Sequence, residues 1–310
     1  MKTGPVTYED LARSVIAVPP LAQTPDLKYS VAANRAIINT LEQAHVTTLM
    51  YGGNANFYNL PISQYEATLS DLIGTASADT WLIPALGPDY GRMVDQVPIL
   101  KALRFPIAMA LPPYPKSYTA VGQLTALRNM SDKLGTPLLM YAKFDNAIAA
   151  ADLKRLVDDG VVAYVKYAVV RDDPGVDDFL RSLVDAVDPH RIISGIGERP
   201  VITHFRRFGL KSFTSGSVAI APRQSMALLH ALQANDFAAA EATRARFLPL
   251  EDCRDRYGPA RVLHDAVTLA GIADCGPLSP LLSNLDQNEC AATGPAARAL
   301  RAGEVPTTAN

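Results

Sequence analysis

The chain has 310 residues, of which 48% are hydrophobic and 19% are charged, with a formal net charge of −2. This composition is that of a globular protein with a large core, and the charge gives no support for partners such as nucleic acid or an anionic membrane surface. No apolar stretch reaches the about 18 residues that span a bilayer, and the N-terminus lacks the apolar core of a signal peptide.

Short apolar segments alternate with segments of helical periodicity along most of the chain. The expected strands are 14–18, 46–51, 81–86, 106–111, 137–141, 160–170, 191–195 and 211–216. The expected helices between them are 29–44, 62–75, 90–103, 118–134, 151–159, 175–187 and 198–208. With a further helix before residue 235, this alternation predicts an α/β fold, a (β/α)8 TIM barrel over residues 1–235.

The remaining residues, 236–310, have helical character. Segment 237–247 is Ala-rich, 259–272 carries an apolar stripe, and a further helix is expected at 286–302. Because this part is small for an independent domain, we expect a C-terminal helical extension that packs on the barrel or mediates assembly. The last residues, 303–310, are expected to be loose.

The active site of such a barrel lies at the C-terminal ends of the strands. This rule selects residues by position alone. The candidates are Gly52, Gly53, Asn54, Tyr114, Tyr141, Lys143, Lys166, Gly195 and Ser215.

Lys166 lies in the apolar segment 160–170, in a strand that helices and barrel interior should cover on both faces. Full burial lowers the pKa of a lysine by up to ~3–5 units and supplies the neutral amine that attacks a carbonyl. Lys166 is therefore a candidate Schiff-base nucleophile. The alternative is a lysine that extends to the strand end or forms an ion pair with an acid such as Asp145.

Two further groups have a chemical and a structural interpretation. Tyr141 ends the strand before that of Lys166, where a phenol can carry protons or simply pack as an aromatic. Gly52-Gly53-Asn54 closes the second expected strand. Its consecutive N–H groups can hold a carboxylate, although the same residues also suit a tight turn.

The histidines and cysteines indicate no metal site. No HxH or HExxH spacing occurs among the five histidines. The three cysteines are odd in number and lack metal-site spacing, which favours a reduced, cytoplasmic protein.

Four segments, taken in their order and spacing, resemble the dihydrodipicolinate synthase / N-acetylneuraminate lyase family of class I aldolases. They are 16–21, 51–56, 137–141 and 161–166. The resemblance implies a barrel with a helical extension, commonly a tetramer, that binds a pyruvate-like 2-oxo acid as a Schiff base on Lys166 without a metal or organic cofactor. It implies that Tyr141 carries protons and that Tyr114 reaches a neighbouring subunit's site. Gly195 and Ser215 fit the ends of strands seven and eight.

The sequence also departs from that family's pattern. Gly53-Asn54 replaces a Thr-Thr pair, and Asn146 stands where dihydrodipicolinate synthase has an arginine that holds the carboxylate of its second substrate. These changes argue against dihydrodipicolinate synthesis itself. Lys143 is a candidate replacement for that arginine, and the alternative is a solvent-facing loop lysine.

The resulting expectation is a Schiff-base lyase, either an aldolase acting with pyruvate or a dehydratase of a 2-keto-3-deoxy sugar acid, in a homo-oligomer (tetramer or dimer). Two alternatives stay open. One is a catalytically quiet paralogue that binds a 2-oxo acid or sugar acid. The other is a barrel enzyme with a metal or phosphate ligand.

Overall fold

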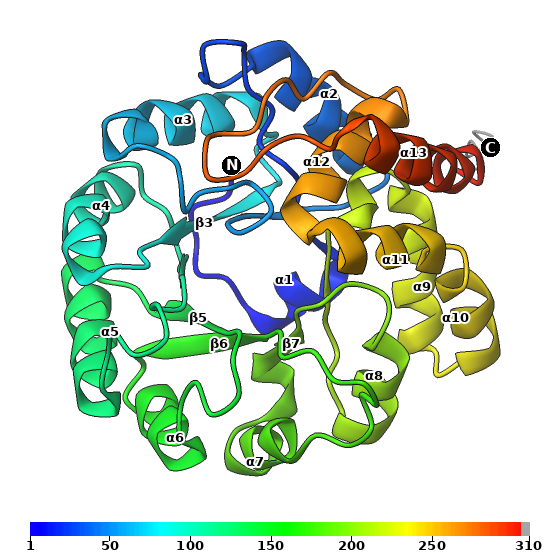
Figure 1. Cartoon of the computed structure of the whole chain (residues 1–310). Coiled ribbons are helices and arrows are strands. Elements are labelled where there is room, and N and C mark those ends of the chain that lie inside the picture. Colours follow the sequence, from blue (N-terminus) through cyan, green and yellow to red (C-terminus); the bar gives the residue numbers. More distant parts are fainter. Residues whose placement is uncertain (305–310) are drawn as a thin grey trace.

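Eight parallel strands form the centre of the molecule, in the spatial order β7-β6-β5-β4-β3-β2-β1-β8. The circle closes between β7 and β8, where Ser194 pairs with Phe213 and the Ser194 N–H donates to the Ser212 carbonyl. The computed structural model describes residues 1–304 and confirms the predicted (β/α)8 TIM barrel (Figure 1). The stretch expected to be loose, 303–310, lies outside the described residues from 305 onward.

Most observed strands are shorter than the apolar segments that predicted them. They are β1 (Ile16–Ala17), β2 (Thr48–Tyr51), β3 (Trp81–Leu86), β4 (Ala108–Ala110), β5 (Leu138–Ala142), β6 (Val162–Tyr167), β7 (Ile192–Ser194) and β8 (Thr214–Ser215). Residues such as Val169, expected in the lysine strand, instead lie in the loop that follows β6 while remaining buried. Apolar residues therefore continue beyond the hydrogen-bonded ladder.

Apart from α1, the helices form the outer ring of the barrel and the extension (Figure 1). They are α1 (Tyr8–Arg13), α2 (Val31–Glu42), α3 (Ile62–Thr75), α4 (Tyr90–Ala102), α5 (Ala120–Leu134), α6 (Ala150–Asp158), α7 (Asp178–Ala186), α8 (Val201–Phe208), α9 (Pro222–Gln233), α10 (Phe237–Arg244), α11 (Leu248–Tyr257), α12 (Pro259–Leu269) and α13 (Gln287–Ala302). Short 3-10 turns occur at Pro189–Arg191 and Ser217–Ala219. Two of these helices, α1 and α11, were not predicted.

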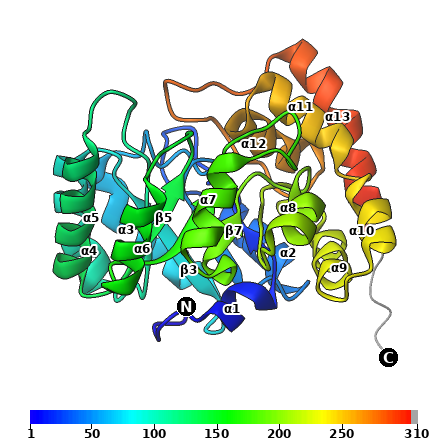
Figure 2. The ribbon, with the colours of Figure 1, turned by 90° about the horizontal axis from the view of Figure 1, so that it is seen from below.

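Helix α1 lies at the end of the barrel where the strands begin. Thr7 and Asp10 form a reciprocal capping box at its start, with N–H···O distances of 3.0 and 3.2 Å. The Tyr164 hydroxyl donates to the Val6 carbonyl at 3.1 Å and ties the segment before α1 to β6. In Figure 2, α1 and the N-terminus lie at the bottom and α11 to α13 at the top.

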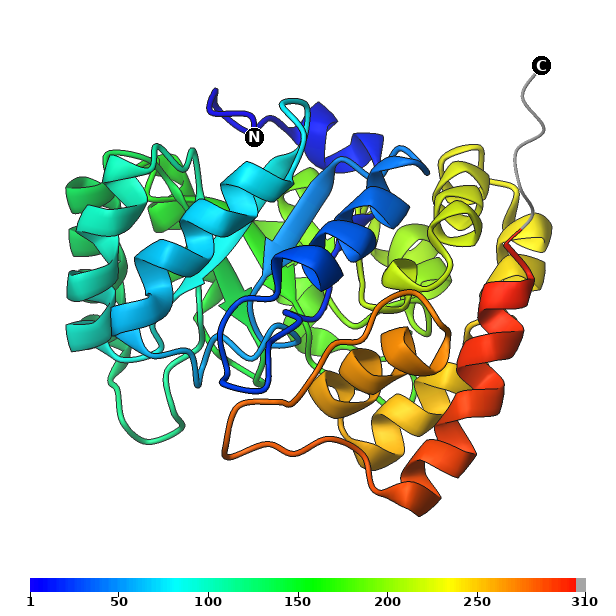
Figure 3. The same cartoon turned by 90° about the horizontal axis from the view of Figure 1, so that it is seen from above.

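The extension packs over the opposite end, where the strands finish. The Gln23 N–H donates to the Cys275 carbonyl at 2.9 Å, and Ser279 is bonded to both Gln23 and Asn56. Figure 3 shows this connection as an orange loop beside the blue first quarter of the chain. The segment between α12 and α13 therefore covers the loops that follow β1 and β2.

Candidate active site

Lys166 is buried on β6, with only 6% of its surface exposed. Among the described residues it has no carboxylate partner, because Asp145 instead binds the Arg171 guanidinium (Nη1···Oδ2 2.6 Å). Burial is the main cause that lowers the pKa of Lys166 to about 7, and the positive charges of Lys143 and Arg254 lower it further. A large share of Lys166 is therefore the neutral, nucleophilic amine at neutral pH.

Tyr141 is the direct neighbour of Lys166. The two residues occupy paired positions in β5 and β6, and the Lys166 Nζ lies 4.7 Å from the centroid of the Tyr141 ring. Burial raises the pKa of Tyr141 to about 12, although the Arg254 charge opposes this rise. The phenol hydroxyl has no hydrogen-bond partner among the described residues, so it is a protonated, uncommitted donor beside an amine.

The turn after β2 offers free backbone donors. The N–H groups of Gly53 and Asn54 have no acceptor within residues 1–304. The Asn54 side chain is fixed from the other side, because its Nδ2 donates to the Val18 carbonyl at 3.2 Å. Two adjacent unpaired N–H groups at a strand end form a site suited to a carboxylate.

Gly195 follows β7 and packs directly against the Lys166 side chain. A Cβ atom at this position would lie 2.8 Å from Lys166 Cγ and 2.5 Å from the Tyr167 carbonyl oxygen. The Gly195 N–H donates to that carbonyl at 2.6 Å. Only a glycine lets this turn approach Lys166 so closely, so its contribution is steric.

Lys143 lies just past the end of β5, and its side chain leans toward the turn after β2. Its Nζ is 5.9 Å from the centroid of the Tyr58 ring. Partial burial lowers the pKa of Lys143. Burial raises the pKa of Tyr58, and the neighbouring Tyr141 and Tyr114 phenols raise it further. Tyr58 was not predicted as a site residue, and its position between these groups places it at the barrel mouth.

Tyr114 and Ser215 make their observed contacts with residues other than Lys166. Tyr114 is 57% exposed in the loop after β4, and its carbonyl accepts a hydrogen bond from the Ser117 hydroxyl at 2.6 Å. Ser215 is buried at the end of β8. Its hydroxyl donates to Glu198 Oε1 at 2.5 Å and accepts from the Val218 N–H at 2.9 Å. The Ser215 hydroxyl is thus committed to internal contacts.

A buried acidic pair, Glu198 in the turn after β7 and Glu251 on α11, was also not predicted. Glu198 accepts from Ser215 and Ser225, and its own N–H donates to Glu251 Oε1 at 2.8 Å. Burial and the nearby Glu251 carboxylate raise the pKa of Glu198 to about 8. Glu251 and Arg254 come from α11, so the extension contributes charged groups to the turn after β7.

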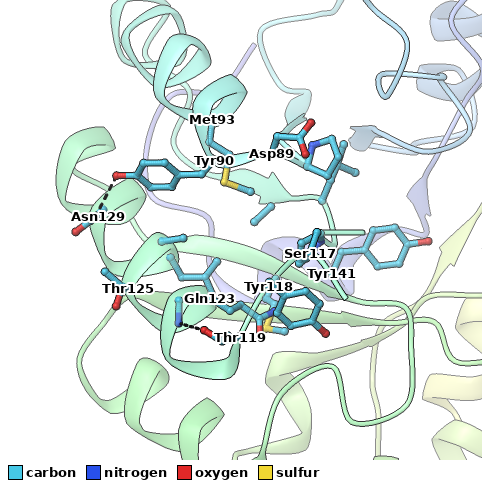
Figure 4. A pocket seen from close by; sticks show the side chains of 18 of the residues that line it. Asp89, Tyr90, Met93, Ser117, Tyr118, Thr119, Gln123, Thr125, Asn129 and Tyr141 are labelled. Atoms are coloured by element: carbon cyan, nitrogen blue, oxygen red, sulfur yellow. Dashed lines mark hydrogen bonds between the residues drawn. The ribbon is translucent and has the colours of Figure 1, made fainter. Parts of the chain in front are cut away.

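A cavity of about 720 Å³ opens between α4, α5 and the loop after β4 (Figure 4). Its polar lining includes Asp89, Tyr118 and Asn129, and Tyr141 forms part of its wall. In Figure 4 the Tyr141 hydroxyl points away from the other labelled side chains. Tyr141 therefore lines this cavity and also contacts Lys166, whose Nζ lies 4.7 Å from its ring centroid.

These features define an enzyme-like (β/α)8 barrel with a buried lysine and a tyrosine on adjacent strand ends. The fold is that of dihydrodipicolinate synthases and sialic acid aldolases. A dihydrodipicolinate synthase from Oceanobacillus iheyensis has a TM-score of 0.83 at 17% identity, over 96% of this chain and 100% of that chain. YagE is a dihydrodipicolinic acid synthase family protein from E. coli K12 that was solved in complex with pyruvate. It has a TM-score of 0.80 at 20% identity, over 93% of this chain and 98% of that chain. The sialic acid aldolase of Ruminococcus gnavus has a TM-score of 0.81 at 13% identity, over 93% of this chain and 96% of that chain.

At these identities the likeness is one of fold, and it confirms the predicted resemblance at that level. The chain matches no protein-family model and no curated protein. Within residues 1–304, no three His, Cys, Asp or Glu side chains group so that they could hold a metal ion. None of the helices in this range is both long and apolar enough to cross a bilayer.

Proposed function

We propose that the protein is a divergent member of the dihydrodipicolinate synthase / N-acetylneuraminate lyase family, a lyase that forms a Schiff base between Lys166 and a 2-oxo acid. One observation carries the proposal. A buried lysine with its pKa lowered to about 7 lies 4.7 Å from the ring of a tyrosine whose hydroxyl has no hydrogen-bond partner within residues 1–304. Unpaired buried lysines are rare, and this placement at the strand ends suits nucleophilic catalysis.

The proposed sequence of steps uses only groups of this chain. The N–H groups of Gly53 and Asn54 hold the substrate carboxylate, and the neutral Lys166 amine attacks C2. Tyr141 donates a proton to the carbinolamine hydroxyl, which leaves as water while the nitrogen lone pair forms the C=N bond. The protonated imine is then an electron sink at C2.

Two reactions follow from that intermediate. In an aldolase, a base removes the proton of the C4 hydroxyl, the C3–C4 bond breaks, and its electron pair moves toward the iminium as an aldehyde leaves. In a dehydratase, C3 loses a proton and the C4 hydroxyl leaves as water after protonation. Tyr141 is the group placed to exchange these protons. In the aldolase, the enamine left by the cleavage takes up a proton at C3 and becomes the protonated imine again. Hydrolysis of the imine then regenerates Lys166 in both cases.

Two compared proteins support this chemistry. YagE was solved in complex with pyruvate, a 2-oxo acid. A Ruminococcus gnavus sialic acid aldolase, 12% identical to this chain, is described as a catalytic lysine mutant, so that aldolase depends on a lysine. The lost Thr-Thr pair and the asparagine at 146 keep dihydrodipicolinate synthesis out of the proposal.

The proposed protein is a homo-oligomer, a dimer or tetramer, in which Tyr114 reaches a neighbouring subunit's site. The exposure of Tyr114 and of Val121 nearby on α5 supports this assembly. Sedimentation velocity of the wild-type chain and of Tyr114→Ala tests it. A monomer in the wild type contradicts the assembly.

Borohydride reduction tests the function. Incubation with pyruvate, and with a panel of 2-keto-3-deoxy sugar acids, is followed by intact mass and peptide mapping. A reduced adduct on Lys166 is expected, and Lys166→Met should show none. The control Lys154→Met removes an exposed lysine on α6 and should keep the adduct. No adduct with any acid, or an adduct on another lysine, contradicts the proposal.

A further inference from the structure

Arg254 comes from the extension rather than from the barrel, yet it lies at the turn that follows the barrel strand β7. Its Nη2 donates to the Ile196 carbonyl at 2.5 Å, and Ile196 directly follows Gly195, the residue packed against Lys166. A Cβ atom at Gly197 would lie 2.5 Å from Arg254 Nη1. The guanidinium is therefore seated on the same turn that borders the lysine.

The contacts of Arg254 fix its position without using all of its donors. Nη1 donates to Glu251 Oε1 at 3.2 Å, and Nη2 donates to Ile196. The other N–H groups of its guanidinium have no hydrogen-bond acceptor among the described residues. Asp255 is 3.9 Å away, but Arg199 binds that carboxylate more closely, at 3.2 Å. Such a fixed, partly free guanidinium is suited to binding a carboxylate.

The charges around the lysine point to an anionic substrate. Lys143 on the β5 side and Arg254 on the β7 side both act on Lys166, and Arg254 also acts on Tyr141. Both of these charges are positive, although Arg254 also pairs with the Glu251 carboxylate at 3.2 Å. The Gly53 and Asn54 N–H groups already account for one carboxylate in the proposed function, so the Arg254 N–H groups that bind neither Glu251 nor Ile196 are left for another.

We propose that Arg254 anchors a second anion-binding subsite at the barrel mouth and that the substrate is a 2-oxo acid with a second carboxylate. This inference rests on the proposed Schiff-base function. Glu251 and the Ile196 carbonyl hold the Arg254 guanidinium in place. Arg254 is thus a specificity-determining residue, and the C-terminal extension supplies it.

The test compares two 2-oxo acids of equal carbon number, 2-oxoglutarate with a second carboxylate and 2-oxopentanoate without one. The half-saturation concentration for borohydride trapping on Lys166 is measured for each, with pyruvate as the reference. The wild type should bind 2-oxoglutarate more tightly. Arg254→Met should raise the value for 2-oxoglutarate by about 10-fold to 100-fold, the effect of a lost charged hydrogen bond. The value for 2-oxopentanoate should change by less than about 3-fold.

Two further variants separate binding from folding. Arg254→Lys keeps the charge and loses the planar fork, so an intermediate loss for 2-oxoglutarate alone is expected. Arg256→Met removes an exposed arginine from the same helix and should change neither value. Thermal unfolding of each variant is recorded, and if Arg254→Met does not fold, Arg254→Lys carries the test.

The outcomes distinguish the two proposals. If none of the 2-oxo acids, pyruvate, 2-oxoglutarate and 2-oxopentanoate included, gives an adduct on wild-type Lys166, the Schiff-base function itself is wrong. If the pyruvate adduct forms but the wild type does not discriminate between 2-oxoglutarate and 2-oxopentanoate, the second subsite is wrong and the function stands. Equal losses for both acids in the Arg254 variants also overturn the subsite, because they indicate a structural role alone.

Discussion

Tyr141 and Lys166 are paired across β5 and β6, and the Lys166 Nζ lies 4.7 Å from the centre of the Tyr141 ring. Parallel strand pairing sets this relationship, so it does not depend on a flexible loop. The two pKa shifts are complementary, because burial favours the neutral form of both the amine and the phenol. The pair can therefore exchange protons with a substrate and avoids holding a charge of its own.

Tyr141→Phe removes the hydroxyl proposed to carry protons. Since that hydroxyl has no partner among the described residues, the variant should fold with an unfolding temperature close to that of the wild type. Its rate of imine formation with pyruvate should fall by about 10²-fold to 10⁴-fold. Stopped borohydride trapping measures this rate. Tyr118→Phe, which lines the neighbouring cavity, is the control, and an unchanged rate in Tyr141→Phe would exclude the proton role.

The pH dependence of imine formation should report Lys166. With the pKa of Lys166 at about 7, the trapping rate should rise through neutral pH and level off above about pH 8. Lys143→Met removes one of the positive charges that lower this pKa, so the rise should move to higher pH. If Lys143 also contributes to carboxylate binding, the variant's Michaelis constant for a dicarboxylate should increase.

Lys154→Met is the matched control for that profile. Its side chain pairs with Asp158 on the exposed face of α6. We expect it to leave the midpoint of the pH profile in place. A Lys143→Met profile that coincides with that of the wild type would show that Lys143 does not act on the nucleophile.

Lys166→Met should stabilise the protein while abolishing the adduct. The pKa of Lys166 is about 7 in the fold and about 10.4 in an unfolded chain, so the unfolded state binds more protons between these values. Wild-type stability should therefore rise with pH in this window relative to Lys166→Met. At pH 7 the variant should be more stable by about 1–4 kcal/mol. Urea unfolding at pH 7 and pH 9 measures the difference, and a less stable variant at pH 7 contradicts it.

For Glu198→Gln, the stability difference from wild type should depend on pH with a sign opposite to that for Lys166→Met. Burial and Glu251 raise the pKa of Glu198 to about 8, so between pH 4.5 and pH 8 the folded state binds more protons than the unfolded state. Wild-type stability should fall with rising pH relative to Glu198→Gln, whose side chain cannot ionise. Glu66→Gln on the exposed part of α3 is the control. If the difference in unfolding free energy between wild type and Glu198→Gln stayed constant over this pH range, the raised pKa of Glu198 would be refuted.

The fold could be predicted from the sequence because each strand and helix has a local pattern. Apolar segments that end at proline or glycine, such as 106–111, mark strands that are buried on both faces. Helix α11 was missed because its sequence is largely polar and its stability depends on packing against α12 and α13. Helix α1 is short, and its signal is the capping box at Thr7 and Asp10.

Site residues were predictable only where the order of the strands alone places them at the barrel mouth. Lys166, Tyr141 and Gly195 follow from the rule that barrel strands end at one face, and the structure brings these three together. Arg254 and Glu198 could not be predicted in this way, because the hydrogen bonds between α11 and the turn after β7 join residues 53 and 58 positions apart. The signal that could have drawn attention to α11 is the spacing of Glu251 and Arg254, which places both on one side of a helix.

The turn after β7 also has a consequence for the order in which the protein matures during synthesis. The last barrel strand ends at Ser215, but the hydrogen bonds that hold Ile196 and Glu198 come from α11, more than thirty residues later. A ribosome releases the strands first. A nascent chain can therefore complete the ring of strands while the turn after β7 still lacks its hydrogen bonds to α11. Such a chain would have its nucleophile before it had a finished binding site, and it would become selective only when the final quarter docks.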